Sequence, residues 1–213
     1  MSTILIVDDH PAFRLVIKMH LAKLLGVNDV FEADNGQTAV EIARQHLPDL
    51  AILDLDIPRI NGLDVIPRLK LAHPDIRVLV LSGQDPSTFA PRAMRAGAQG
   101  FVGKSQEMKE IMRGVEAVMA AYTVFPMNIG ATGTSPTLAA GEEEEKLELL
   151  SDKELMILQM LAKGMSNKTI GDALFISNKT VSSHKTRIMS KLRVKSLVEL
   201  IDFARRCRVS PAQ

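Results

Sequence analysis

Three aspartates and one lysine have the residue types and spacing of a phosphoryl-transfer site. Asp54 follows a short apolar run and is soon followed by Pro58, a pattern that leaves its carboxylate at the end of a buried strand. Asp8 and Asp9 end an earlier run of the same kind, and Lys104 follows a later one. Neighbouring carboxylates need a hard cation among them, and Mg2+ suits this role because it keeps waters that a phosphate can replace. With that ion, Asp54 could attack a phosphoryl donor and become an aspartyl-phosphate.

Charge on the transferring group would be neutralised by the metal and by Lys104, and the hydroxyl of Ser82 could hydrogen-bond a phosphoryl oxygen. Each residue alone has an ordinary explanation, since Ser82 could belong to a turn, Phe101 to the core and Lys104 to the surface. We interpret His10 and His20 as a loop residue and a helix-face residue rather than as ligands. The convergence of the acids and the lysine is what favours a functional site.

Alternating strands and helices in the first half of the chain must position these residues. Apolar runs predict strands at residues 4–7, 30–33, 50–53, 78–81 and 100–102. Helical spacing follows each run; the first helix is expected from Pro11 to Gly26, and the third is expected to be interrupted or bent at Pro67. This alternation predicts an α/β fold, a five-stranded parallel sheet covered by helices on both faces. In the flavodoxin-like strand order 2-1-3-4-5, the acids, the serine and the lysine would meet at one mouth of the sheet.

A change of composition divides the chain after its first half. Residues 122–146 contain a stretch rich in Gly, Thr and Ser and the acidic run Glu142 to Glu145, which is typical of a linker. We therefore predict a domain at residues 1–121, a linker at 122–146, and an all-α domain of four helices at 147–213. The helices are expected from Ser151 or Asp152 through Lys163, from Asn167 to Leu174, from Ser177 through Leu192, and from Ser196 to Arg206.

The third helix of this second domain is basic. No acid lies between Asp172 and Glu199, and the bases there are Lys179, Lys185, Arg187, Lys191, Arg193 and Lys195. Two helices joined by the tight segment 175–177, the second of them basic, favour a helix-turn-helix that enters the major groove of DNA. An ordinary solvated helix face would also explain the charge by itself. Helical spacing turns Val181, Ile188 and Leu192 inward and Lys179, Ser182, Ser183, Thr186 and Arg187 outward.

The remaining composition excludes some classes of protein. Cys207 is the only cysteine, so the chain can form neither an internal disulfide nor a zinc site built from cysteines. We see no basic and apolar leader, and no apolar run approaches the roughly 18 residues of a spanning helix. We therefore expect a cytoplasmic protein with no membrane partner.

Residues 3–120 resemble a response-regulator receiver domain. The matching features are Val7-Asp8-Asp9, Asp54 with Pro58 and Gly62, Leu81-Ser82-Gly83, and Gly100-Phe101-Val102-Gly103-Lys104. The resemblance implies that Asp54 is the phosphoacceptor and that Lys104 is the partner of the phosphate. It implies Mg2+ ligands at Asp9, at Asp54 and at the backbone carbonyl of Asp56, with Asp8 acting largely through water.

The same resemblance implies that Ser82 and Phe101 are a switch pair. Phe101 stands where tyrosine is often found, so it cannot make a hydroxyl hydrogen bond. The side chains of Asp56 and Gln84 lie at positions that tend to tune the lifetime of the phosphoryl group.

Residues 149–207 resemble the LuxR-type helix-turn-helix of the NarL/FixJ regulators. The match runs through Leu150-Ser151, Glu154, Leu158, Leu161-Ala162-Lys163-Gly164, Ser166-Asn167-Lys168-Thr169-Ile170, Ile176-Ser177, Thr180-Val181, His184, Lys191-Leu192 and Val198-Glu199-Leu200. It implies base contacts by Ser182, Ser183 and Thr186. It implies phosphate contacts mainly by Lys179, Thr180, His184, Lys185 and Arg187.

Together, the two halves look like a full-length NarL/FixJ response regulator, and the detail resembles the BvgA-like members. The resemblance implies a two-component regulator that is not an enzyme. A sensor histidine kinase or phosphotransfer protein would phosphorylate Asp54 and so control binding to double-stranded DNA and transcription. A homodimer is expected, with the last helix (Leu197, Val198, Leu200, Ile201) as dimer face or domain core, and RNA polymerase is a further candidate partner.

Two alternatives remain open. Asp54-Leu55-Asp56 after a strand resembles the nucleophile motif of haloacid-dehalogenase-like phosphatases, in which the second acid is a general acid. Against it, Pro58 replaces the usual Thr or Val, that motif normally lies on the first strand, and Asp8 and Asp9 are left unexplained. The other alternative is a DNA-binding regulator that is never phosphorylated, which the intact acidic set disfavours.

Overall fold

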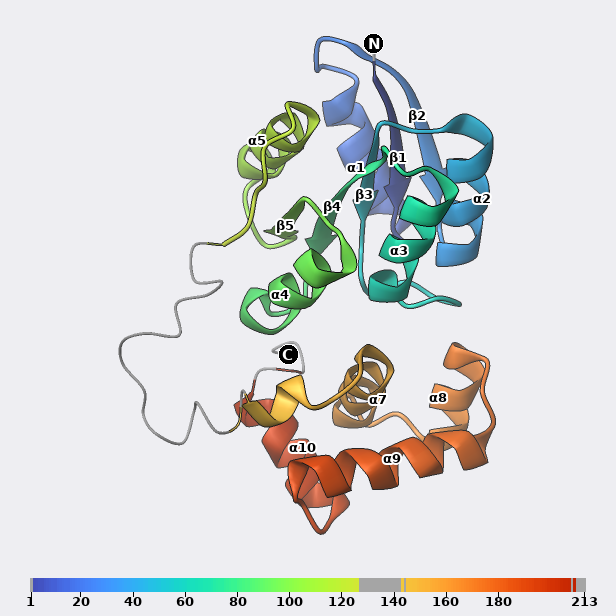
Figure 1. The fold of residues 1–213 in the computed structure, drawn as a ribbon, viewed down its shortest axis with the longest axis vertical. Coiled ribbons are helices and arrows are strands. Elements are labelled where there is room, and N and C mark those ends of the chain that lie inside the picture. Colours follow the sequence, from blue (N-terminus) through green and yellow to red (C-terminus); the bar gives the residue numbers. More distant parts are fainter. Residues whose placement is uncertain (1, 127–142, 144, 208, 210–213) are drawn as a thin grey trace. The chain divides into compact units, whose positions relative to one another are not determined.

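The computed structural model describes residues 2–126, 143, 145–207 and 209 (Figure 1). The chain separates into two compact units, Met1–Ile129 and Gly130–Gln213, and each is described by itself. Of the predicted linker at 122–146, residues 127–142 and 144 lie outside the described part. Val124, also in that range, forms a parallel bridge to Gly100 at the edge of the sheet, and residues 145–148 are helical.

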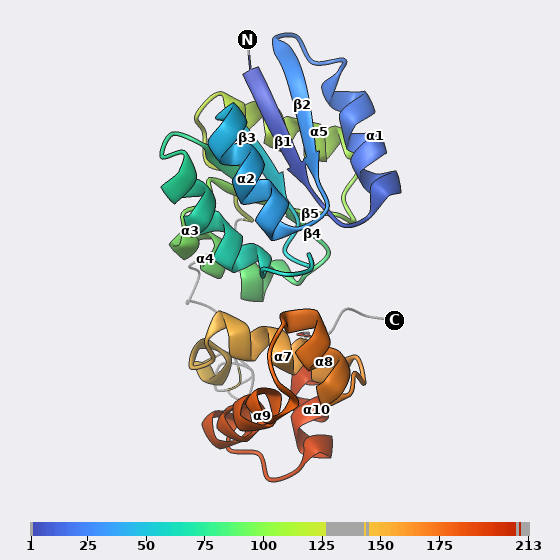
Figure 2. The ribbon, with the colours of Figure 1, turned by 90° about the vertical axis from the view of Figure 1, so that its right-hand side faces the viewer.

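The first unit is a parallel sheet with helices on both faces (Figures 1 and 2). Its elements alternate along the chain as β1 (Ser2–Val7), α1 (Pro11–Leu21), β2 (Val27–Ala33), α2 (Gly36–His46), β3 (Leu50–Leu53), α3 (Gly62–Ala72), β4 (Arg77–Ser82), α4 (Pro86–Ala96), β5 (Gly100–Gly103) and α5 (Met108–Met119). The five strands are ordered β2-β1-β3-β4-β5. The predicted fold class and strand order are therefore confirmed.

The middle of the sheet is buried on both faces, which explains why β1, β3 and β4 are nearly continuous apolar runs, whereas the edge strand β2 carries exposed polar residues. One face packs on α1 and α5 through a cluster that includes Ile4, Ile6, Ile17 and Val115. The other face lies under α2, α3 and α4, which Figure 2 shows on the opposite side of the sheet from α1 and α5. Helices on both faces leave the strand ends as the place where polar side chains from several strands can meet.

Strand register aligns the ends of β1 and β3. Val7 lies opposite Leu53, and the amide of Asp54 donates a hydrogen bond of 2.8 Å to the carbonyl of Val7. The next residues along these two strands are Asp8 and Asp54, so the pairing of apolar residues brings these two acids to adjacent positions.

Some predicted elements differ from those in the structure. Helix α1 ends at Leu21 rather than at Gly26, because Gly26 has φ +90° and its carbonyl accepts a hydrogen bond from the amide of Ser2, which turns the chain into β2. Strand β2 begins at Val27 rather than Val30, since β1 supplies hydrogen-bonding partners for the polar residues at its start. Helix α3 runs without a break through Pro67.

The second unit contains α7 (Asp152–Ala162), α8 (Asn167–Leu174), α9 (Asn178–Leu192) and α10 (Leu197–Arg206). The side chains of Ser151, Ser166, Ser177 and Ser196 each accept a hydrogen bond from the amide three residues later, so a serine cap starts every one of these helices. Phe175, between α8 and α9, has φ +53° and makes the turn. Among the described residues, no helix has the length and apolar character needed to cross a bilayer.

Candidate functional site

Asp8 and Asp54 lie side by side at the carboxyl ends of β1 and β3. Their residues are 3% and 2% exposed, so both carboxylates are held out of solvent. Asp9, the next residue in the chain, is exposed at the rim. Burying two acids together is unfavourable unless positive charge lies beside them.

That positive charge comes from Lys104, which follows β5. Its Nζ lies 2.6 Å from Oδ2 of Asp8 and 2.6 Å from Oδ2 of Asp54. The backbone amide of Lys104 donates to the carbonyl of Ser82 at the end of β4, which fixes the position of the lysine. Both buried carboxylates thus share one ammonium, and Asp9 adds a third carboxylate beside them.

The pKa values of the buried pair follow from this arrangement. Burial raises the pKa of Asp54, and the nearby Lys104 opposes this only in part. For Lys104, burial would lower the pKa, but the attraction of Asp54 and Asp8 outweighs it and raises the pKa above the ordinary value. The ion pair with Lys104 therefore offsets only part of the cost of burying Asp54.

The donor set fits a hard divalent cation. Asp8, Asp9, His10 and Asp54 each offer a ligand atom, and these atoms all lie within 4.8 Å of one another. Carboxylate oxygens are the ligands that Mg2+ prefers. His10 was interpreted from sequence as a plain loop residue, yet its Nδ1 lies 2.7 Å from Asp9 and 3.3 Å from Asp8. Its position next to the acid pair was the only signal for this contact.

Asp56 and Gln84 lie next to Asp54 and are linked to it by a chain of hydrogen bonds. The amide of Asp56 donates to Oδ1 of Asp54 at 3.2 Å. The side-chain amide of Gln84 donates to Oδ2 of Asp56 at 2.9 Å, and its backbone amide donates to the hydroxyl of Ser82 at 3.3 Å. These bonds join the loop after β3 to the loop after β4. Sequence reasoning singled out both positions but did not predict that they bond to each other.

Ser82 and Phe101 lie on neighbouring strands. Ser82 ends β4 and is fully buried. Phe101 lies on β5, pairs with Val80 of β4 and is 2% exposed. The side chain of Phe101 is part of the interior in this conformation.

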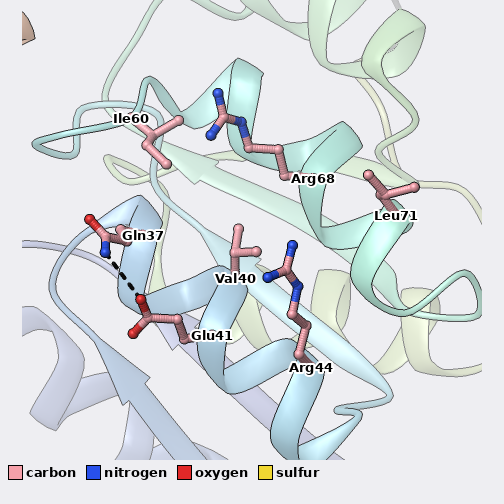
Figure 3. Close-up of a pocket in the computed structure, with 7 residues that line it drawn as sticks. All are labelled: Gln37, Val40, Glu41, Arg44, Ile60, Arg68 and Leu71. Atoms are coloured by element: carbon pink, nitrogen blue, oxygen red, sulfur yellow. Dashed lines mark hydrogen bonds between the residues drawn. The ribbon is translucent and has the colours of Figure 1, made fainter.

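A separate pocket of about 530 Å3 lies between α2 and α3 (Figure 3). Its lining residues are Gln37, Val40, Glu41, Arg44, Ile60, Arg68 and Leu71. None of the predicted site residues lines it, so this pocket is distinct from the acidic mouth.

In the second unit, α9 has an apolar side and a polar side, as its spacing predicted. Val181, Ile188 and Leu192 are buried. The exposed side chains on the opposite side are Lys179, Ser183, Thr186 and Arg187. Thr180 and Lys185 are half-buried. Ser182 is half-buried too, and its hydroxyl accepts a hydrogen bond of 3.1 Å from Asn167 of α8.

His184 differs from the other predicted DNA contacts. It is half-buried, and its Nδ1 is buried with no hydrogen-bond partner among the residues that the structure describes. Burial lowers the pKa of His184, and the charges of Lys153 and Arg187 lower it further. A neutral imidazole is therefore favoured at this position.

Comparison with protein families gives two matches along the chain. The model of the response regulator receiver domain matches residues 4–116. The model of the bacterial regulatory proteins of the luxR family matches residues 148–204.

Similar proteins span nearly the whole chain. A putative transcriptional regulator of Pseudomonas aeruginosa is 50% identical over 97% of this chain and 98% of its own length. The virulence factors putative positive transcription regulator BvgA of Bordetella pertussis is 45% identical over 96% and 97%. Among solved structures, RcsB of Salmonella enterica serovar Typhimurium bound to promoter rprA with the phosphomimetic BeF3- has a TM-score of 0.68. It covers 95% of this chain and 98% of its own at 23% identity, which supports the fold.

Proposed function

Because the chain belongs to the NarL/FixJ response regulators, which are DNA-binding transcription regulators of two-component systems, we propose that Asp54 is the residue at which it receives the phosphoryl group. The observation that carries this proposal is the meeting of Asp54, Asp8 and Lys104 at the carboxyl end of the sheet, with both Lys104 contacts at 2.6 Å. The donor would be a phosphohistidine of a sensor kinase or of a phosphotransfer protein.

The two oxygens of Asp54 have different partners, and this suggests which one reacts. Oδ1 accepts the amide of Asp56, while Oδ2 faces the ammonium of Lys104. We assign Oδ2 as the nucleophile. The bond from phosphorus to Oδ2 forms while the bond from phosphorus to the donor nitrogen breaks, and the leaving imidazole takes a proton from solvent. Lys104 then transfers its hydrogen bond from the carboxylate to a phosphoryl oxygen.

Asp8, Asp9, Asp54 and the backbone carbonyl of Asp56 are the proposed holders of Mg2+. When bound, this ion neutralises negative charge on the transferring group. The clustering of ligand atoms within 4.8 Å supports the assignment of Asp8, Asp9 and Asp54.

Phosphorylation adds a charge of about −2 beside Ser82 and Phe101. We propose that the hydroxyl of Ser82, which now accepts from the amide of Gln84, turns to the phosphoryl group. Phe101 then shifts within the interior, and the surface formed by α4 and β5 changes shape. That surface would report the state of Asp54 to the DNA-binding half of the chain.

In that half, Ser182, Ser183 and Thr186 are proposed to contact bases, and Lys179, Thr180, His184, Lys185 and Arg187 to contact phosphates. Four of these side chains are exposed on one side of α9, which supports the assignment: Lys179, Ser183, Thr186 and Arg187. We further propose a cytoplasmic homodimer that binds twofold-related half-sites, with α10 as dimer face and RNA polymerase as the partner that reads the bound complex. The division into residues 1–121, 122–146 and 147–213 also remains a proposal, as does the lack of catalytic turnover.

Genomic footprinting of the full chain with and without acetyl phosphate tests this function. We expect protection of a limited set of promoters, strengthened by the phosphodonor in the wild type and unchanged by it in Asp54→Asn. If acetyl phosphate does not change the protection of DNA by either protein, the result would favour a regulator that is never phosphorylated. Turnover of a phosphate ester would favour the phosphatase alternative.

A further inference from the structure

The ammonium of Lys104 has a third neighbour besides the two acids. Its Nζ lies 4.8 Å from the centre of the ring of Phe13, which is within the range of a cation–π contact. The ring approaches from α1, whereas the acids approach from the ends of β1 and β3. The lysine is thus held from different sides by partners of different chemistry.

Phe13 is fixed independently of Lys104. It lies in the first turn of α1, two residues after the Pro11 that starts the helix, and its amide donates to the carbonyl of His10. Its half-buried side chain packs against the apolar cluster between the sheet and α1. A ring anchored in this way can orient the ammonium rather than follow it.

The acids cannot hold Lys104 in the same way throughout the reaction. Both of them belong to the cluster that could hold a cation, so an ion bound there would compete with Lys104 for their oxygens. When Asp54 attacks the phosphoryl donor, Lys104 also loses its contact with Oδ2 of Asp54, because that oxygen becomes bonded to phosphorus. The contact with Phe13 is not consumed by either event, since the ring is neither a metal ligand nor a nucleophile.

We propose that Phe13 is a positioning residue that keeps the ammonium of Lys104 at the phosphoryl-binding position while the carboxylates change partners. This inference rests on the proposed function of Asp54. A cation–π contact depends on the negative face of the ring, so it weakens as electron-withdrawing fluorines are added with little change of shape.

The test uses the full chain with phenylalanine, mono-, di- and trifluorophenylalanine at position 13, together with Phe13→Leu. The rate of formation of phosphorylated Asp54 from acetyl phosphate with Mg2+ should fall stepwise with each fluorine, and Phe13→Leu should be about three- to ten-fold slower than wild type. Equal fluorination of Phe31, which stacks on His46 instead, is the matched control and should leave the rate unchanged.

A second measurement needs no phosphodonor and no metal. The NMR signal of the Lys104 ammonium should move in proportion to the number of fluorines at position 13, while thermal unfolding stays the same. Equal rates and an unmoved Lys104 signal across the series would overturn the role of Phe13 while leaving the phosphoacceptor in place. A wild type that is not phosphorylated at Asp54 would instead overturn the proposed function, and the Lys104 signal would still decide the contact.

Discussion

Lys104 and Asp54, which are 50 positions apart in the chain, meet at 2.6 Å in the mouth of the sheet. The same ammonium is equally close to Asp8. One lysine therefore balances two buried acids, and the third acid, Asp9, is left at the rim. This imbalance is the physical basis for expecting a cation and then a phosphoryl group at this place.

Replacing Lys104 by methionine keeps most of the volume of the side chain but removes its charge. We expect phosphorylation of Asp54 by acetyl phosphate to slow by about 10²- to 10³-fold, the usual effect of losing one stabilising donor in a charge-developing transition state. The measurement is the rate of mass gain of the intact protein. Lys109→Met, on the exposed side of α5, should behave as wild type. A Lys104→Met protein that reacts at the normal rate would show that the contact has no part in the transfer.

Magnesium should stabilise the first unit against unfolding. A ligand that binds only the folded state adds about 2.7 kcal/mol at a concentration of 100 Kd. Calorimetry of the full chain should show a higher unfolding temperature with Mg2+ for the wild type, and a much smaller rise for Asp9→Asn. Asp29→Asn, which removes an exposed acid of β2, is the control and should keep the full rise. An Asp9→Asn protein that is stabilised as much as wild type would place the ion elsewhere.

Acid should weaken α7 through Glu154. Burial alone would raise the pKa of Glu154, but its ion pair with Lys191 at 2.6 Å and its bond to the Ser151 amide lower the pKa below the ordinary 4.5. A lowered folded-state pKa means that this stabilisation is present above the unfolded pKa and is lost as pH falls through the folded one.

Glu154→Gln should therefore cost about 1–2 kcal/mol of unfolding free energy at pH 7, a size typical of helix caps. The difference from wild type should shrink as the pH falls below 4.5. Urea unfolding at several pH values measures it, with exposed Glu148→Gln as control. A difference that stays constant down to pH 3 would mean that the charge of Glu154 does not stabilise the helix.

The DNA contacts of α9 can be sorted by salt dependence. Lys185→Ala should weaken binding to all DNA alike and reduce the slope of log affinity against log salt by about 0.9. Ser183→Ala should keep the slope, cost about 1–3 kcal/mol on the preferred site and relax specificity. Both are measured by fluorescence anisotropy at several salt concentrations. A change of sequence preference in Lys185→Ala with no change of slope would show that the contacts are wrongly sorted.

The sequence predicted the acidic mouth because strand ends are well marked in it. Each of Asp8, Asp54 and Lys104 follows an apolar run, and parallel strands must end at the same edge of the sheet. The serine caps of the second unit were equally readable, since a serine followed by helical spacing is a local signal. Ser151 and Glu154 even form a complete capping box.

Contacts set by tertiary packing could not be predicted in this way. The ring of Phe13 beside Lys104 and the bond from Gln84 to Asp56 depend on how elements that are far apart in the sequence face one another. Helix α1 was predicted too long because Leu24 continues the helical spacing, while the bond from Ser2 to the carbonyl of Gly26 turns the chain. No periodicity in the sequence reports such long-range bonds.

Phosphorylation of Asp54 itself is the most direct measurement. The full chain should be incubated with acetyl phosphate and Mg2+ and analysed by intact mass and peptide mapping. We predict one added phosphoryl group on Asp54 in the wild type and none in Asp54→Asn. The matched control is Asp56→Asn, which removes a neighbouring acid and should still gain one phosphoryl group on Asp54. Labelling that persists in Asp54→Asn, or that maps to another residue in the wild type, would contradict the role assigned to this acid.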